Sequence, residues 1–372
     1  MDKILLIAQE GLNKGGVQTV IMSIVENLHH KYQFDIILFT KEVRYYDSLF
    51  ESYGGKIFRI AYFKNSNKWL KRINKILNSS ISYFRIKRII RNNGPYKAIH
   101  CHNSIESVTA LRAARSQGIK NRINQIHVVF DDSSLNCLQK VKYDRAKTQM
   151  TQLATTSIGC SKMACESFFK GDYQIILNPY NEKLFAQIDL ESPRFNAPVI
   201  IQVGNLSGLK NQIFTLKTFK FLLQKYPNAH LNFIGRDCGA YNSLKDYITN
   251  NSMDSNVTFY AQDADIPKLM HHSSFLVLPS LTESFGIVLV EAQAMGLRCF
   301  VSNKVPQEAN VGGCVYLPID DTEKTWAEAI DKEFIVSGGI HQKYDVSRFS
   351  SKTISEQIDF LYNKNRNDYE YI

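Results

Sequence analysis

The chain has 372 residues, of which 44% are hydrophobic and 22% charged, a composition typical of globular proteins and a length too great for one hydrophobic core. Two domains are therefore expected, and a disordered, fibrous or repeat protein is excluded. The first apolar run stops at Gln9–Glu10, which argues against a secretion signal, and no stretch reaches the about 18 apolar residues that cross a bilayer. The seven cysteines form no CxxC pair, so we expect reduced thiols.

Positive charge is concentrated in the first half of the chain. Residues 1–180 contain 27 Lys/Arg and 13 Asp/Glu, and within them residues 52–105 contain 12 basic side chains and no acidic one. Within residues 68–91, apolar positions recur at helical spacing with basic side chains between them: Trp69, Ile73, Ile76, Leu77, Ile81 and Phe84. This helix could simply cover a sheet, or its basic face could bind anionic lipid headgroups or a pyrophosphate group. Nucleic acid is disfavoured because no nucleic-acid motif accompanies the charge.

Short apolar runs alternate with helical patterns along the whole chain, as in parallel α/β units. The expected strands are 4–8, 34–39, 98–102 and 122–128, then 198–204, 229–235, 256–260, 274–279 and 299–302. Regular periodicity lapses over residues 176–198, where three prolines occur, so the linker is placed there. We predict two Rossmann-like domains, 1–180 and 181–348, that face each other across a cleft. Ligands should then lie at the carboxyl ends of the strands.

Two features of the first domain are candidates for ligand contact. Gly15 and Gly16 precede a helix predicted from Val17, where backbone can approach a phosphate or sugar, although the pair lacks the dinucleotide fingerprint and also fits a tight turn. Histidines follow at predicted strand ends: His100, His102 and His127. His127 is the preferred candidate for hydrogen bonding to substrate, with structural packing as the open alternative for each ring. A zinc site is rejected because no Cys or acidic ligand is suitably spaced.

The segment FLVLPSLTESFGIVLVEAQAMG predicts a strand that ends at Pro279–Ser280 and a helix that begins near Ser284. Glu283 and Glu291 frame this helix, and eight helical residues rise about 12 Å, so the two carboxylates could address different parts of one elongated ligand. Free N–H groups around residues 285–287 would bind an anion. The alternative is an amphipathic helix whose glutamates are only capping and solvated.

These residues carry a family resemblance. PSLTESFGIVLVEAQAMG (279–296) resembles the E-x7-E signature of family 4 of the retaining glycosyltransferases. VGNLSGLKN (203–211) resembles that family's glycine–basic–lysine loop, HLNFIGRDCG (230–239) its second glycine turn, and NKGGVQTVIMSI (13–24) its N-terminal glycine loop. HCHNSIESVTALRAA (100–114) and VSNKVPQEANVGGCVYLP (301–318) are similar to transferases of capsular and exopolysaccharide synthesis.

The resemblance implies a GT-B fold in which residues 349–372 form a helix that packs back on the first domain. The first domain would bind the acceptor and residues 181–348 the nucleotide-sugar donor. Lys210 would hold the donor diphosphate, Glu291 the ribose and Glu283 the donor sugar. The remaining donor contacts would come from Gly15, Gly16, Asn205, Gly235, Arg236, Ser284, Phe285, Gly286, Ile287 and Val288.

Two positions depart from the family pattern. Asn205 stands where the family usually has arginine, so either Lys210 suffices or Arg236 compensates. Gln125 occupies the place of the first of two histidines that related transferases show near His127.

The implied activity is retaining transfer of a hexosyl or N-acetylhexosaminyl group from a UDP-sugar, without metal or prosthetic group. The acceptor would be lipid-linked or a polysaccharide in bacterial capsule, exopolysaccharide or lipopolysaccharide synthesis. The protein would be cytoplasmic and peripheral on the inner face of the membrane, held by its basic first domain. A nucleotide-sugar epimerase and a non-catalytic accessory subunit remain alternatives, while a phosphorylase-like enzyme lacks its pyridoxal-lysine signature.

Overall fold

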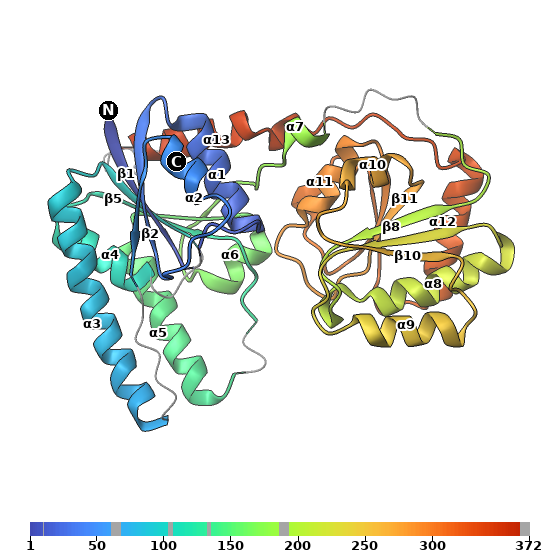
Figure 1. Ribbon diagram of the computed structural model, residues 1–372, viewed down its shortest axis with the longest axis horizontal. Helices are drawn as coiled ribbons and strands as arrows, with labels where there is room; N and C mark the ends of the chain where they lie inside the picture. Colours follow the sequence, from blue (N-terminus) through green and yellow to red (C-terminus); the bar gives the residue numbers. More distant parts are fainter. Residues whose placement is uncertain (10, 61–67, 103–106, 132–134, 186–192, 365–372) are drawn as a thin grey trace. The chain divides into compact units, whose positions relative to one another are not determined.

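A computed structural model describes residues 1–9, 11–60, 68–102, 107–131, 135–185 and 193–364, with the side chains of residues 68–78 outside the description. The chain divides into two compact units. Unit 1 comprises Met1–Pro179 and Ser351–Ile372, and unit 2 comprises Tyr180–Ser350 (Figure 1). No helix among the described residues is both long and apolar enough to cross a membrane.

Unit 1 is built on a seven-stranded parallel sheet of order β3-β2-β1-β4-β5-β6-β7. Its strands are β1 (Asp2–Ala8), β2 (Tyr32–Leu38), β3 (Lys56–Arg59), β4 (Ala98–His102), β5 (Asn121–Ile126), β6 (Thr156–Gly159) and β7 (Gln174–Ile175). Its helices are α1 (Gly16–Leu28), α2 (Asp47–Ser52), α3 (Lys68–Asn93), α4 (Ser107–Ser116), α5 (Cys137–Leu153), α6 (Lys162–Phe168) and α13 (Ser351–Asn363).

Helices cover both faces of this sheet. Alternate β1 residues Ile4 and Leu6 share a core cluster with residues of α1 and α13, while Leu5 and Ile7 are buried on the opposite face. Helices α3, α4 and α5 lie side by side as one layer (Figure 1). The final helix α13 contacts α1 and buries its apolar stripe in the same core cluster, so it is part of unit 1 although it follows unit 2 in the chain.

The described part of α3 buries a different face from the one predicted. Phe84 was expected on the apolar face but is 66% exposed. Ser82, Ile86 and Ile90, spaced four residues apart, are buried instead, because they form the stripe that meets the rest of unit 1. The predicted basic face between residues 68 and 78 lies outside the described side chains.

Unit 2 has a six-stranded parallel sheet of order β10-β9-β8-β11-β12-β13. Its strands are β8 (Val199–Val203), β9 (His230–Ile234), β10 (Val257–Tyr260), β11 (Phe275–Leu278), β12 (Arg298–Ser302) and β13 (Cys314–Leu317). Its helices are α7 (Glu182–Phe185), α8 (Gln212–Lys225), α9 (Tyr241–Asn250), α10 (Ile266–His271), α11 (Ile287–Ala294) and α12 (Glu323–Ser337), with 3₁₀ turns η1 (Gly208–Lys210), η2 (Gln307–Ala309) and η3 (Ser347–Phe349).

In both sheets the chain starts at a central strand, builds outward, and then returns to the other side of that strand. The order therefore reverses between β1 and β4 in unit 1 and between β8 and β11 in unit 2. Ligands of open parallel sheets bind at the carboxyl ends of the strands beside such a reversal. Strands β8 and β11 pair through only two residue pairs, Phe275↔Ile200 and Leu276↔Ile201, so the loops that follow them are not held together by the ladder.

Candidate active site

The loops that follow β8 and β11 bring Lys210 and Glu283 together at the reversal point of unit 2. Lys210 ends the 3₁₀ turn η1, and its Nζ forms an ion pair with Oε1 of Glu283. The same carboxylate oxygen accepts a hydrogen bond of 3.0 Å from Oγ of Ser280, which is fully buried. The lysine stem passes over Gly204, where an added Cβ would lie 3.4 Å from Lys210 Cε. A cation and a carboxylate thus share one site at the sheet edge.

Further hydrogen bonds join these two loops directly. The N–H of Leu281 donates to the carbonyl of Leu209 at 2.9 Å, and the side-chain amide of Asn211 donates to the carbonyl of Pro279 at 3.2 Å. Asn211 adopts the left-handed conformation with φ 54°, which asparagine tolerates better than most residues. Lys210 and Glu283 therefore lie in two loops that are hydrogen-bonded to each other.

A third loop, after β9, is packed against the loop after β8. A Cβ on Gly235 would lie 2.1 Å from the carbonyl oxygen of Gly204, so only glycine allows this approach. The N–H of Leu206 donates to the carbonyl of Arg236 at 2.9 Å, which holds Arg236 beside the loop that contains Asn205. Arg236 is exposed, and its guanidinium has no hydrogen-bond or ion-pair partner in the part of the chain that the structure describes.

The acidic residue of this third loop caps the next helix. Oδ1 of Asp237 accepts hydrogen bonds from the N–H groups of Gly239, Ala240 and Tyr241 at 2.8 to 3.1 Å. These backbone hydrogen bonds, that of Tyr241 first, lower the pKa of Asp237. Asp237 therefore has a structural role, which leaves Arg236 as the loop's available charged group.

The helix after β11 begins later than the sequence analysis predicted. Helix α11 starts at Ile287, because Gly286 adopts the left-handed conformation with φ 80° and ends the preceding loop. The prediction of a helix from Ser284, with Glu283 and Glu291 joined by about 12 Å of helix, is therefore wrong. Ser284 and Phe285 lie in the loop, and the N–H groups of Ile287 and Val288 are at the helix N-terminus.

Glu291 lies one turn into α11 and is partly buried. Burial raises the pKa of its carboxyl group to about 7. Among the described residues, this carboxylate has no hydrogen-bond or ion-pair partner. A partly buried carboxylate without a protein partner is available to accept hydrogen bonds from a ligand that supplies donors.

In unit 1, the predicted glycines lie at the N-terminus of α1, next to the reversal point. Gly15 is the N-cap residue, with φ −146° and ψ 160°, and Gly16 begins the helix one residue earlier than predicted. A Cβ on Gly16 would meet nothing within 4 Å. Among the described residues, the space beside Gly16 is therefore open, whereas a Cβ on Gly15 would lie 2.6 Å from Oε1 of Gln18.

The three predicted histidines form one buried row that starts on β4. The rings of His100 and His102 stack with centroids 4.2 Å apart, and Nδ1 of His102 lies 3.0 Å from Nε2 of His127. The row ends at Oδ1 of Asn178, 3.2 Å from Nδ1 of His127, and at the hydroxyl of Tyr362, 2.9 Å from Nδ1 of His100. Both ring nitrogens of His127 are thus engaged with protein groups.

Burial keeps these histidines neutral. Desolvation lowers the pKa of His100 to about 3 and that of His127 to about 4, and it lowers the pKa of His102 well below the usual value. Among the described residues, Nε2 of His102 is buried and has no hydrogen-bond partner. Gln125 lies beside His102 in the register of β4 and β5, and its Oε1 is also unpartnered within the described ranges.

Comparisons with known proteins identify relatives of this chain. Residues 188–313, which include Lys210, Glu283 and Glu291, match the family model described as glycosyl transferases group 1. The match lies within unit 2 and identifies a group 1 glycosyltransferase segment of the chain. The chain is 25% identical over 349 residues to the putative glycosyltransferase EpsF of Bacillus subtilis, a match that covers 88% of this chain and 87% of EpsF.

Other relatives of this glycosyltransferase have named activities or solved structures. It is 25% identical to the UDP-Gal:alpha-D-GlcNAc-diphosphoundecaprenol alpha-1,3-galactosyltransferase of Escherichia coli, over 77% of this chain and 76% of that protein. Its fold resembles that of Anabaena HepE, crystallised in complex with UDP, with a TM-score of 0.74 at 16% identity over 96% of this chain and 98% of HepE. The predicted GT-B fold of two parallel-sheet domains is confirmed.

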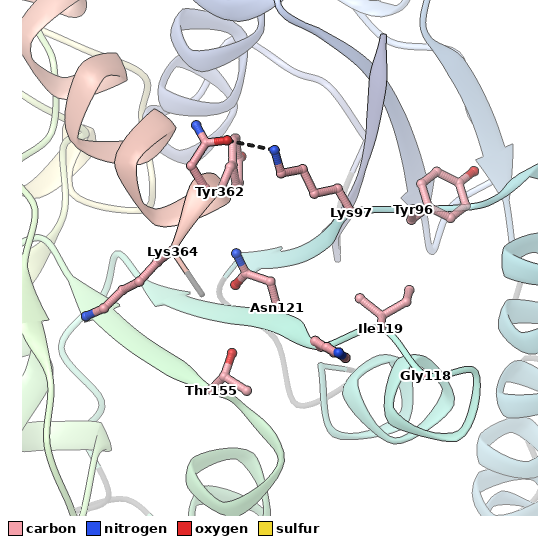
Figure 2. Close-up of a pocket in the computed structure, with 10 residues that line it drawn as sticks. Tyr96, Lys97, Gly118, Ile119, Asn121, Thr155, Tyr362 and Lys364 are labelled. Atoms are coloured by element: carbon pink, nitrogen blue, oxygen red, sulfur yellow. Dashed lines mark hydrogen bonds between the residues drawn. The ribbon is translucent and has the colours of Figure 1, made fainter. Parts of the chain in front are cut away.

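A separate hollow of the glycosyltransferase lies at the opposite edge of the unit 1 sheet. Figure 2 shows Lys97, Asn121 and Thr155, which precede or begin β4, β5 and β6, around a cavity of about 300 Å³ beside Tyr362. Nζ of Lys97 is hydrogen-bonded to Asn363 at 2.6 Å and ion-paired with Asp2 at 2.8 Å. None of the predicted site residues lines this hollow, and it lies at the amino ends of the strands.

Some residues that shape the site were missed by sequence reasoning. Gln202 and Ser280 are buried, and both hydrogen-bond to groups of the loops that carry Lys210 and Glu283. Gln202 could have been identified from the sequence, because it is a polar residue within the apolar strand VIIQV. Ser280 could not have been identified in this way, since a serine after a strand is typical of any loop.

Proposed function

We propose that this glycosyltransferase transfers a hexosyl or N-acetylhexosaminyl group from a UDP-sugar, with retention of anomeric configuration, to a lipid-linked or polysaccharide acceptor. The observation that carries the proposal is the pairing of Lys210 with Glu283 at the reversal point of the unit 2 sheet. The UDP bound to HepE and the undecaprenol-linked acceptor named for the Escherichia coli relative support the choice of donor and acceptor class.

Unit 2 would bind the donor through a cation, backbone amides and two carboxylates. Lys210 and the N–H groups of Ile287 and Val288 would hold the diphosphate, because a helix N-terminus and an ammonium group both favour negative charge. Glu291 would accept hydrogen bonds from the ribose hydroxyls, and this would satisfy its unpartnered carboxylate. Glu283 would accept from hydroxyls of the donor sugar while it remains close to Lys210.

Arg236 would supply the second cation that the family usually has at position 205. The backbone bond between Leu206 and Arg236 places the arginine next to Asn205, and its guanidinium is exposed and without a protein partner among the described residues. An arginine can bind a diphosphate through two parallel N–H groups. Gly235 would be required because it lets this loop approach Gly204.

The transfer step would form a bond between the acceptor oxygen and C1 of the sugar, on the same face from which the diphosphate leaves. The bond between C1 and the phosphate oxygen breaks, and the proton of the acceptor hydroxyl passes to an oxygen of the departing diphosphate. Lys210 would stabilise the charge that develops on the leaving group, so the step would need neither metal nor prosthetic group. Correct placement of the reactants supplies much of the remaining catalysis.

Unit 1 would bind the acceptor at the carboxyl edge of its sheet, where Gly15, Gly16 and the histidine row lie. His127 would contact a substrate hydroxyl only by releasing His102 or Asn178, since both of its ring nitrogens are engaged. The basic charge of the first half of the chain would attract an anionic membrane surface and so place the protein on the inner face of the cytoplasmic membrane.

Calorimetric titration with UDP, GDP and their common sugars tests the proposal, with and without chelator. We expect chelator-insensitive binding of a UDP compound that weakens about 10- to 100-fold in Lys210→Ala and Glu291→Ala, since each removes hydrogen bonds to or from a charged group. Lys217→Ala is the matched control, because Lys217 pairs with Glu323 on the surface of unit 2. Absence of binding to every nucleotide would reject the active transferase in favour of an accessory subunit, and isomerised donor without transfer would favour an epimerase.

A further inference from the structure

Gln202 is a buried amide inside the otherwise apolar strand β8. Its side chain is 1% exposed, and it lies two residues before the loop that begins at Gly204. Burial of an amide is unfavourable unless its donor and acceptor atoms are both satisfied. The partners of Gln202 therefore indicate what its presence in the strand achieves.

Both ends of the Gln202 amide are hydrogen-bonded. Nε2 donates to the main-chain carbonyl of Lys210 at 2.7 Å, and Oε1 accepts from Oγ1 of Thr215 at 2.7 Å. A carbonyl oxygen can only accept, so the amide nitrogen must face Lys210, and this fixes the orientation of the side chain. Thr215 is itself 1% exposed and lies on α8, the helix that follows the loop.

The Lys210 carbonyl needs such a partner because η1 is very short. Lys210 is the last of three residues in the turn, and the next residue, Asn211, has a left-handed backbone. A single 3₁₀ turn is not stable by itself and leaves carbonyl groups unpaired at its end. The bond from Gln202 satisfies that carbonyl and joins the loop to the centre of the sheet.

A second buried glutamine holds the beginning of the same loop. Nε2 of Gln212 donates to the carbonyl of Asn205 at 2.9 Å, and its Oε1 accepts from the N–H of Ser207 at 3.3 Å. Gln212 therefore fixes residues 205–207, whereas Gln202 bonds to the residue that carries the ammonium group. Of the two glutamines, Gln202 is the one that contacts Lys210 directly.

We propose that Gln202 is a positioning residue that fixes the backbone of Lys210 so that its ammonium group lies at Glu283 and at the donor diphosphate. The diphosphate part of this inference rests on the proposed function, while the placement of Lys210 at Glu283 does not. Thr215 orients the Gln202 amide through its hydrogen bond to Oε1. The aliphatic stem of Lys210 packs over Gly204, so the position of the Lys210 backbone determines where its amine lies.

The test uses Gln202→Met and the double variant Gln202→Met/Thr215→Val in the full chain. The double variant replaces both polar partners by apolar groups of similar size, which preserves the fold better than the loss of one partner. Thr218→Val is the matched control, because Thr218 is on the same helix, is 1% exposed, and has a hydroxyl without a partner among the described residues. The measurements are the Kd for UDP, the acylation rate of the Lys210 amine relative to Lys217 by mass spectrometry, and Tm.

We expect both Gln202 variants to weaken UDP binding on the order of tenfold and to raise the acylation rate of Lys210 several-fold, while Thr218→Val changes neither. In a Lys210→Ala background, Gln202→Met should have no further effect on UDP binding. An undiminished effect in that background, or a change in Tm alone, overturns the proposal. If the unsubstituted protein binds no UDP, the proposed function fails, and the acylation rates still decide the role of Gln202.

Discussion

Lys210 and Glu283 form an ion pair between two loops of unit 2, with side chains that are 25% and 12% exposed. In the absence of donor, Glu283 therefore neutralises the cation assigned to the diphosphate. We expect Glu283→Gln to bind UDP about two- to fivefold more tightly, because a partly exposed ion pair contributes up to about 1 kcal/mol. The same variant should lose transfer activity, since the carboxylate no longer accepts hydrogen bonds from the donor sugar.

Calorimetry with UDP and a transfer assay separate these two effects. Glu323→Gln is the charge-matched control, because it removes a carboxylate that pairs with Lys217 at 3.4 Å in the same unit. Weaker binding of UDP by Glu283→Gln would show that Glu283 assists the nucleotide rather than opposing it.

Glu291 should make donor binding depend on pH near neutrality. Burial raises the pKa of this carboxyl to about 7, so the free protein holds it mostly protonated at pH 6 and mostly ionised at pH 8. If the ionised form accepts the ribose hydroxyls, affinity for a UDP-sugar should rise as pH increases through 7. The affinity of Glu291→Gln should be lower and nearly independent of pH over that range, as measured by calorimetry in matched buffers.

The same shift has the opposite effect on folding stability. A carboxyl whose pKa is raised in the folded state stabilises the fold below its unfolded pKa of 4.5, and this contribution is lost as pH rises toward 7. Glu291→Gln should therefore show a smaller loss of Tm between pH 4.5 and 7 than the unsubstituted protein. Parallel curves for the two proteins would contradict the raised pKa.

Gly235→Ala should disrupt the donor site through contact between two loops. The new Cβ would lie 2.1 Å from the Gly204 carbonyl oxygen, so one backbone must move, at a cost of about 1–3 kcal/mol in the free energy of unfolding. Because the displaced loop adjoins Lys210, UDP affinity should fall by roughly tenfold or more. Gly208→Ala is the control, since its Cβ would meet nothing within 4 Å and its φ is not positive.

Urea unfolding and calorimetry on the two glycine variants make this comparison. Equal losses of UDP affinity in Gly235→Ala and Gly208→Ala would show that the loop tolerates no substitution and that the contact with Gly204 has no special role.

Much of the fold followed from local sequence pattern, whereas the site depended on contacts between distant segments. The apolar runs predicted most strands within one or two residues, because buried parallel strands are continuously apolar. The start of α11 was misplaced because the left-handed conformation of Gly286 leaves no trace in the hydrophobic pattern. The buried face of α3 was misplaced because several apolar stripes were available and only packing selects among them.

The family resemblance supplied the identities of Lys210, Glu283 and Glu291, but not their surroundings. The Ser280 hydroxyl that meets Glu283 comes from three residues earlier in the same loop, whereas the Tyr362 hydroxyl that meets His100 comes from the last helix. No spacing rule predicts the Tyr362 partner, since it depends on the order of strands and the packing of α13.

The positive charge of Arg236 can be moved to position 205 in the neighbouring loop to test whether the charge itself binds UDP. Arg236→Ala should weaken UDP binding about tenfold, because a hydrogen bond to a charged group contributes about 1.5–3 kcal/mol at most. Asn205→Arg in the same background should restore much of the affinity, since the backbone bond between Leu206 and Arg236 places the two positions side by side. Asn205→Gln is the uncharged control, and restoration by this variant in calorimetry would exclude a role for charge.

The histidine row should make unit 1 sensitive to acid. His100 and His127 have folded pKa values of about 3 and about 4, below the unfolded value of 6.5, so the unfolded chain binds more protons between these limits. Their contribution to stability is fully present above pH 6.5 and is lost as pH falls toward 4, by at most about 1.4 kcal/mol per pH unit for each ring.

Helix α13 should be the first element to respond to this loss, because His100 meets the Tyr362 hydroxyl at 2.9 Å. Hydrogen exchange with pH-corrected labelling times would show α13 opening as pH falls to 5. His100→Gln, whose amide can still bond to Tyr362, should protect α13 at that pH, whereas His30→Gln at an exposed position should not. Equal protection of α13 in all three proteins would mean that protonation of the row does not govern the docking of this helix.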